Sequence, residues 1–189
     1  MSLTPVTHSL ADLARPLATL AAMYLAEPSD NQIAYLRNPD LTSRWPLSGP
    51  IFQRGAALVV ESALARETRE KICSDYHRQL APEIKLSAQP LARQHLDLTL
   101  DELVTTFSSH DALIDTNLPA DHLGVILSAI ATLAGGNRDR VARAWSHQYL
   151  GTWAAEACEQ MALRSATMFY QGVFTLTAAL IEDLISETR

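Results

Sequence analysis

Apolar residues recur every three or four positions along most of the chain, a spacing that places them on one face of a helix. The clearest case runs from Leu10 to Leu25, where leucine and other apolar residues follow this spacing. The same spacing, bounded by capping and turn residues, predicts helices over about 29–37, 51–65, 68–80 and 117–136, and another that begins at a capping box formed by Thr99 and Glu102. Two or three more helices are expected over about 138–164 and 165–187. No segment of about four to eight residues alternates apolar and polar positions between turn residues, so we expect essentially no β-sheet.

The predicted elements indicate an all-α fold, a single compact domain of about eight helices over residues 1–189. A chain of this length can bury one substantial core and is marginal for two domains. It has no internal repeat of fixed period, which argues against a helical solenoid. The segments 38–50 and 81–98 are expected to be long connections. Because such connections can exchange elements between protomers, both a monomer and a domain-swapped dimer remain open.

Composition and charge narrow the class of protein. Hydrophobic residues make up 48% of the chain and charged residues 19%, which is typical of a packed globular protein. The formal net charge is −6, and no basic stripe suits nucleic acid or an anionic membrane. Residues 1–16 lack the pattern of a signal peptide, and no apolar run approaches the roughly 18 residues of a membrane span. We therefore expect a soluble cytoplasmic protein without membrane insertion, and its two cysteines are expected to be buried free thiols.

The sequence offers little catalytic chemistry. None of its six histidines forms an HExxH motif, and neither cysteine has a partner at zinc-site spacing. The GxSxG, GxxxxGK[ST] and GxGxxG motifs are all missing. Two aspartate–histidine pairs are adjacent in the sequence, His110 with Asp111 and Asp121 with His122. Neither pair makes an acid–base dyad, because neighbours on a helix point in different directions. We expect no catalytic residues, no metal and no cofactor, and therefore a protein that is not an enzyme.

The stretch NLPADHLGVILSAIATLAGG, residues 117–136, changes abruptly from polar to apolar and permits two interpretations. In the first it is only the start of a helix. Pro119 then fits the first turn, where its missing N–H has no intrahelical partner, and Asp121 in the same turn interacts favourably with the helix dipole. His122 lies at the edge of the apolar row that follows. In the second interpretation Asp121 and His122 belong to a binding site; the physics of the residues alone favours the first.

The PADHL element of this stretch resembles the helix start of the TorD/DmsD/NarJ family of redox-enzyme maturation chaperones. Further segments resemble the family in the same order along the chain, at 23–30, 44–47, 75–80, 89–97, 149–153 and 169–170. The chain departs from the family pattern at three positions in or next to these segments. Leu80 stands where phenylalanine is usual, Ala81 where glycine is usual and Tyr149 where histidine is usual. The resemblance thus covers nearly the whole chain, but only PADHL is specific, so the subfamily and its client stay open.

The resemblance implies an all-helical, TorD-like cytoplasmic protein without a catalytic centre. Members of that family bind the precursor of a molybdenum-containing reductase, often through its twin-arginine signal peptide, and delay export until the cofactor is inserted. Whether this chain would contact the signal peptide or the mature part of the precursor stays open. The alternative is an all-helical interaction or regulatory protein whose partner is not a reductase.

A twin-arginine signal presents two guanidinium groups followed by an apolar segment, so its receptor should place a polar mouth beside an apolar groove. In the PADHL element, Pro119 to Leu123, the Asp121 carboxylate could accept a bidentate hydrogen bond from arginine. His122 could add a polar contact that changes with pH near neutrality. Tyr76, Leu80 and Pro90 are candidates for the apolar wall, although simple core packing is at least as good an interpretation for Leu80. The row Trp145, Tyr149 and Trp153 is expected to be a core stripe and is left out of the site.

Overall fold

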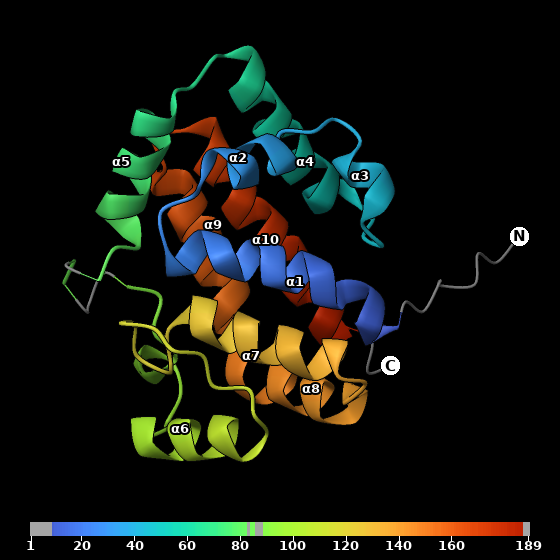
Figure 1. The fold of residues 1–189 in the computed structure, drawn as a ribbon, viewed down its shortest axis with the longest axis vertical. Coiled ribbons are helices and arrows are strands. Elements are labelled where there is room, and N and C mark those ends of the chain that lie inside the picture. The colour runs from blue at the N-terminus through green and yellow to red at the C-terminus, as the bar shows by residue number, and fades with distance from the viewer. Residues whose placement is uncertain (1–8, 83, 86–88, 187–189) are drawn as a thin grey trace, which may run out of the picture.

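Helix packing in the computed structural model is dominated by three long contacts (Figure 1). Helix α1 (Leu10–Leu25) packs along α7 (Leu123–Gly135), and α10 (Met168–Ser186) packs along both α4 (Pro50–Leu64) and α9 (Trp153–Arg164). The other elements are α2 (Asp30–Leu36), α3 (Leu41–Arg44), α5 (Arg69–Gln79), the 3-10 turn η2 (Ala92–Gln94), α6 (Leu100–Ser109), α8 (Asp139–Trp145) and the π-helical turn η3 (Ser146–Leu150).

The structure describes residues 9–82, 84–85 and 89–186. Within these ranges there is no β-strand, and the prediction of an all-α single domain is confirmed. The expectation about a signal peptide falls partly on residues 1–8, which lie outside the described residues. The same holds for position 187, the expected end of the last helix, and for positions 83 and 86–88 of the segment 81–98.

One hydrophobic cluster joins the helices, and α10 is at its centre. This helix buries eleven of its residues, among them Phe169, Tyr170 and Phe174. It approaches α4 so closely that a Cβ added at Gly172 would lie 2.8 Å from the carbonyl oxygen of Gly55. The pair of glycines therefore permits backbone contact between the two helices.

By length and composition alone, α10 could also cross a membrane, since its apolar window has a mean hydropathy of 1.2. This differs from the expectation that no segment approaches that length. The expectation considered uninterrupted apolar residues, whereas α10 also contains Gln171, Glu182 and Asp183. In this structure 61% of the window is buried inside the molecule.

Two expectations about these elements are wrong, and one open expectation is decided. The helix expected over 117–136 begins only at Leu123, so Pro119 and Asp121 precede it and do not lie in its first turn. The region 138–164 contains two α-helices, α8 and α9, which are separated by η3 and by Gly151, whose φ of 46° is left-handed. The segment 38–50 is not a free loop, because it contains α3 and buries Leu41, Trp45 and Leu47 in the core. In each case a tertiary contact or one residue's backbone conformation outweighs the apolar spacing.

Helix starts that carry their own capping residues match the prediction. Thr99 and Glu102 form the predicted capping box at the start of α6, with the Thr99 hydroxyl 2.8 Å from Glu102 Oε2. Ser29 caps α2 through the backbone N–H of Gln32. These capping hydrogen bonds form within one helical turn and need no tertiary partner.

Candidate functional site

The PADHL element is joined by its backbone to the segment that follows α5. Leu91 and His122 form an isolated antiparallel bridge. On one side of it the N–H of Leu123 donates to the carbonyl of Pro90 at 2.9 Å, and on the other the N–H of Ala92 donates to the carbonyl of Asp121 at 2.9 Å. We call this pairing of 90–92 with 121–123 the clasp. It fixes the start of α7 against a connection that has no long helix of its own.

Asp121 reinforces the clasp from inside the molecule. Its side chain is fully buried, and its Oδ2 forms an ion pair with Arg93 Nε at 3.1 Å and accepts a hydrogen bond from the Arg93 backbone N–H at 3.2 Å. The Arg93 side chain is 33% exposed and so extends from the surface to the buried carboxylate. Asp121 Oδ1 has no hydrogen-bond partner among the described residues. An arginine from another molecule could therefore take this carboxylate only by displacing Arg93 or by joining it at Oδ1.

His122 is the N-cap of α7. Its Nδ1 accepts a hydrogen bond from the N–H of Gly124 at 3.2 Å, which leaves the ring proton on Nε2. The side chain is fully buried, not at the edge of the core as expected. Burial lowers the pKa of His122 to about 4, so the prediction of a contact that changes with pH near neutrality is wrong. His122 is a neutral capping group in this fold.

The structure separates the remaining predicted site residues into two groups. Pro90 and Pro119 lie at the clasp, where the Pro119 carbonyl accepts the N–H of His122 at 2.9 Å. Tyr76 and Leu80 belong to α5 and its C-terminal end and are buried in the core, with exposed fractions of 4% and 0%. Core packing, the alternative given for Leu80, is its role in this structure. Neither side chain lines the grooves described below.

An open groove of about 380 Å³ lies between the clasp segment and α9. We call it the α9 groove. Its lining includes Pro90 and His95 on one side and Trp153, Glu156, Glu159 and Met161 on the other. His95 stacks on Trp153 with ring centroids 4.9 Å apart and planes inclined by 11°. The groove thus has an apolar floor next to the residues that Asp121 and His122 hold in place.

The two carboxylates of the α9 groove are exposed, three positions apart on α9. Arg164 contributes one cation to the lining, so Glu156 and Glu159 leave the groove with net negative charge. Carboxylates at the rim of an apolar groove can bind a guanidinium group while the floor covers apolar atoms. This arrangement offers the polar mouth and apolar groove that a receptor for a cationic peptide requires.

Sequence reasoning missed most of this groove. Trp145, Tyr149 and Trp153 are buried, as predicted for a core stripe, but Trp153 also reaches the groove floor. Arg93 and His95 lie in a segment predicted to be irregular, where no periodicity indicates which side chains point inward. The spacing of Trp153, Glu156 and Glu159 could have indicated this side of the groove from the sequence, because residues three apart share a helix face.

Within the described ranges, no group of three or more histidine, cysteine, aspartate or glutamate side chains is placed to hold a metal ion. Comparison of the chain with models of protein families gives no match, and no curated protein matches it.

Proposed function

We propose that this protein is a cytoplasmic chaperone for the precursor of a molybdenum-containing oxidoreductase. It would bind the twin-arginine signal peptide in the α9 groove and hold the precursor until its cofactor is inserted, without catalysis or a cofactor of its own. The resemblance of PADHL and the other segments to the TorD/DmsD/NarJ family suggests the partner. The observation that supports it best is the α9 groove, in which Glu156 and Glu159 stand over an apolar floor beside the PADHL clasp.

In this proposal Glu156 and Glu159 contact the arginines of the peptide. Both carboxylates are exposed and can form charge-assisted hydrogen bonds with a guanidinium group. Asp121 and His122 act as positioning residues, because they are buried and fix the segment that supplies Pro90 and His95 to the groove. This assignment explains how Asp121 and His122, which are both fully buried, could still determine binding.

The test is a titration of fluorescent peptides against the full chain. One peptide carries a twin-arginine signal, and the other has both arginines replaced by glutamine. We expect only the arginine peptide to bind, and we expect the double variant E156Q/E159Q to weaken it by about three- to tenfold, since exposed ion pairs contribute about 0.2–1 kcal/mol each. High salt should remove most of the difference between this variant and the wild type.

The matched control is E61Q/D101N, which changes the net charge equally at exposed positions outside the α9 groove. We expect this control to bind like the wild type. Equal weakening by both double variants would contradict the assignment of the groove, because it would indicate attraction by overall charge. Equal binding of the arginine and glutamine peptides would contradict the proposed function itself.

Affinity capture from the protein's own host then identifies the client. We expect recovery of an unexported precursor of a molybdenum-containing oxidoreductase under conditions that induce it. Recovery of an unrelated protein that competes with the arginine peptide would favour the alternative, an interaction protein with a non-reductase partner.

A further inference from the structure

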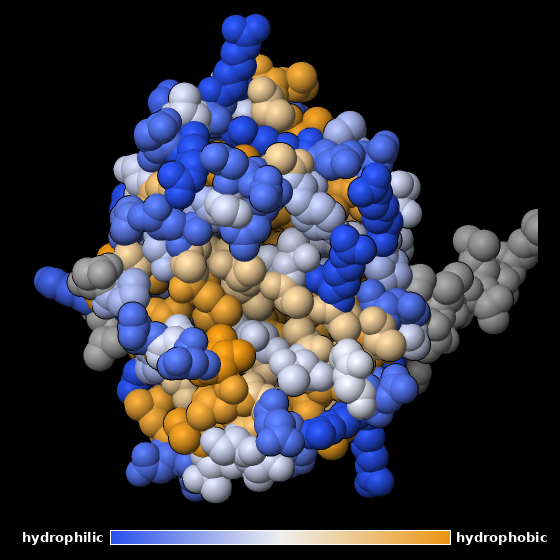
Figure 2. All heavy atoms as spheres, in the orientation of Figure 1, coloured by the Kyte–Doolittle hydropathy of each residue, from blue (hydrophilic) through white to orange (hydrophobic). Residues whose placement is uncertain are grey.

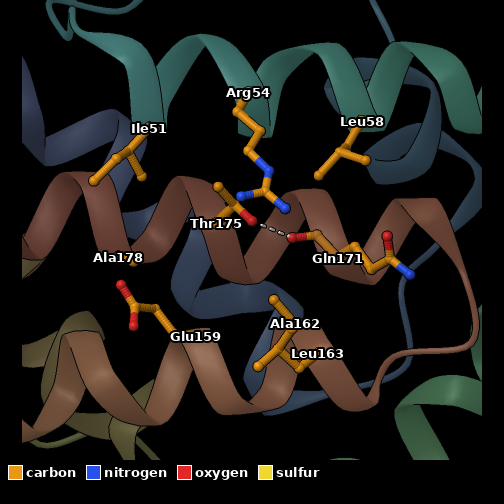
Figure 3. A pocket seen from close by; sticks show the side chains of 9 residues that line it. All are labelled: Ile51, Arg54, Leu58, Glu159, Ala162, Leu163, Gln171, Thr175 and Ala178. Atoms are coloured by element: carbon orange, nitrogen blue, oxygen red, sulfur yellow. Dashed lines mark hydrogen bonds between the residues drawn. The ribbon is translucent and has the colours of Figure 1, made fainter.

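A second groove, of about 430 Å³, runs along the opposite side of α9 (Figure 3). We call it the α4 groove, because α4 forms one wall and α9 the other, with α10 between them. Its apolar lining is made by Ile51, Leu58, Ala162, Leu163 and Ala178. A pocket of this size and composition fits an apolar segment of a ligand or partner.

The two grooves share one residue, Glu159, which lines both of them. The exposed residues of α9 follow helical spacing from Glu156 through Glu159 and Gln160 to Leu163. The face that separates the grooves is therefore acidic in its first part and ends with the apolar Leu163, followed by the exposed Arg164. Leu163 is 77% exposed, which leaves a large apolar side chain available for contact.

We propose that the two grooves form one track for a single partner segment. A cationic stretch lies in the α9 groove, and the apolar stretch that follows it crosses the α9 face near Glu159 and lies in the α4 groove. This inference rests on the proposed function and deepens it, because it specifies where each part of the peptide binds. A segment with arginines followed by apolar residues has the charge and hydropathy order that the track presents.

Arg54 gives the track a direction. Its exposed guanidinium lies in the middle of the α4 groove, over Thr175 and facing α9 (Figure 3). A second arginine placed there would meet a like charge, whereas an apolar side chain would contact Ile51 and Leu58 on either side of Arg54 along α4. Repulsion of the wrong part of a ligand contributes to specificity as much as attraction of the right part.

Another groove lies where α6, α7 and the segment between them meet. Apolar atoms gather over this part of the molecule, at the lower left of Figure 2. The lining of this groove includes Val104 and Leu113, which are 40% and 41% exposed. It shares no lining residue with the α9 groove. The α4 groove adjoins the α9 groove through Glu159, whereas no lining residue joins this third groove to it, so the observations favour the α4 groove.

The experiment uses the full chain and two peptides, one with the arginines and the following apolar stretch and one truncated after the arginines. We expect Leu163→Ser to weaken binding of the long peptide about tenfold, in line with the loss of one buried leucine side chain. The same variant should leave binding of the truncated peptide unchanged. Because Leu163 is exposed, the substitution leaves the core intact, and circular dichroism provides the check on folding.

Leu64→Ser is the matched control, since Leu64 is 78% exposed and lies on α4 outside the lining of the α4 groove. Leu113→Ser tests the groove beside α6 in the same way. Both variants should bind the two peptides like the wild type. Loss of long-peptide binding in Leu113→Ser but not in Leu163→Ser would overturn the track.

The outcomes also separate this inference from the proposed function. If E156Q/E159Q weakens both peptides and Leu163→Ser weakens neither, the arginine site stands and the track is wrong. If the wild type binds neither peptide, the proposed function fails and the track fails with it.

Discussion

Asp121 and His122 are sequence neighbours and are both fully buried, but Asp121 has a charged partner whereas His122 is neutral. The Asp121 carboxylate receives a guanidinium and a backbone N–H from Arg93. His122 receives one backbone N–H at Nδ1 and no charged partner among the described residues, so burial keeps its ring neutral. A buried ion pair is costly to break, whereas a buried neutral histidine is costly to charge. Loss of the Arg93 cation should therefore destabilise the fold through Asp121, whereas acid should destabilise it through His122.

Removing the cation of the clasp should destabilise the fold. We expect Arg93→Ala to lower the free energy of unfolding by about 2–4 kcal/mol, because it leaves a buried carboxylate without its charged partner. The matched control is Arg44→Ala, whose partner Asp40 is 4.0 Å away and 73% exposed, and we expect it to cost less than about 0.5 kcal/mol. Urea denaturation followed by circular dichroism measures both. Equal stabilities of the two variants would mean that the Arg93 pair contributes nothing to the clasp.

Acid should destabilise the protein through His122. The pKa of this residue is about 4 in the fold, below its ordinary value near 6.5, so the unfolded chain binds a proton that the folded chain does not. Stability from this group is complete above pH 6.5 and is lost as the pH falls toward 4, by roughly 3 kcal/mol in total.

The comparison protein is His122→Asn, which retains an N-cap acceptor but does not titrate. Unfolding free energies measured from pH 7 to pH 4 should fall more steeply for the wild type than for this variant. Parallel curves for the two proteins would show that His122 is protonated equally in the folded and unfolded states.

At the scale of elements, the start of a helix can be stabilised by residues that are distant in the sequence. The start of α10 has two carboxylates from elsewhere in the chain. Asp75 Oδ2 accepts the N–H of Ala166 at 3.0 Å and that of Thr167 at 2.9 Å, and Glu67 Oε1 accepts the N–H of Met168 at 2.8 Å. Negative groups at a helix start satisfy free N–H groups and interact favourably with the dipole. Asp75 belongs to the segment 75–80 that resembles the chaperone family, and here it has a clear structural role.

The crossing of α4 and α10 permits a test at the same scale. A Cβ at Gly172 would lie 2.6 Å from Val59 Cγ1 and 2.9 Å from the Val59 backbone nitrogen, so Gly172→Ala must separate the helices. We expect it to destabilise the protein by about 1–3 kcal/mol. Gly135→Ala is the control, because its Cβ would meet nothing closer than Ala14 Cβ at 3.8 Å. Thermal unfolding of Gly172→Ala at the temperature of the wild type would show that the crossing relaxes without cost.

At the scale of the whole molecule, burial is unevenly distributed. Helix α7 buries ten of its thirteen residues, and α10 is packed against α4, α9 and α1. Helix α6 lies at the lower edge of the molecule (Figure 1) and buries only Leu103 and Phe107. Phe107 stacks on Trp145 with ring centroids 4.8 Å apart and contacts Tyr149 edge-on. Leu103 and this aromatic group attach α6 to the rest of the protein.

Because burial differs between the helices, we expect local unfolding to differ between them as well. Amide hydrogen exchange should be slowest in α7 and α10 and much faster in α6, because segments with few buried side chains open without global unfolding. Exchange followed by mass spectrometry on the unliganded protein measures this. Protection of α6 equal to that of α10 would contradict the expectation and indicate a single cooperative unit that includes α6.

The order of the main helices followed from the sequence alone, because apolar spacing and capping residues such as Thr99 with Glu102 act within a few turns of the chain. The same is true of the absence of strands among the described residues and of the buried row at Trp145, Tyr149 and Trp153. The site was different. The sequence indicated Asp121 and His122, but burial of both and the pairing with Arg93 depend on a segment 28 residues away. The α9 groove requires that segment to meet α9, and the α4 groove requires α4, α9 and α10 together. Only the tertiary structure could decide these contacts, because they join residues far apart in the chain whose local patterns do not depend on each other.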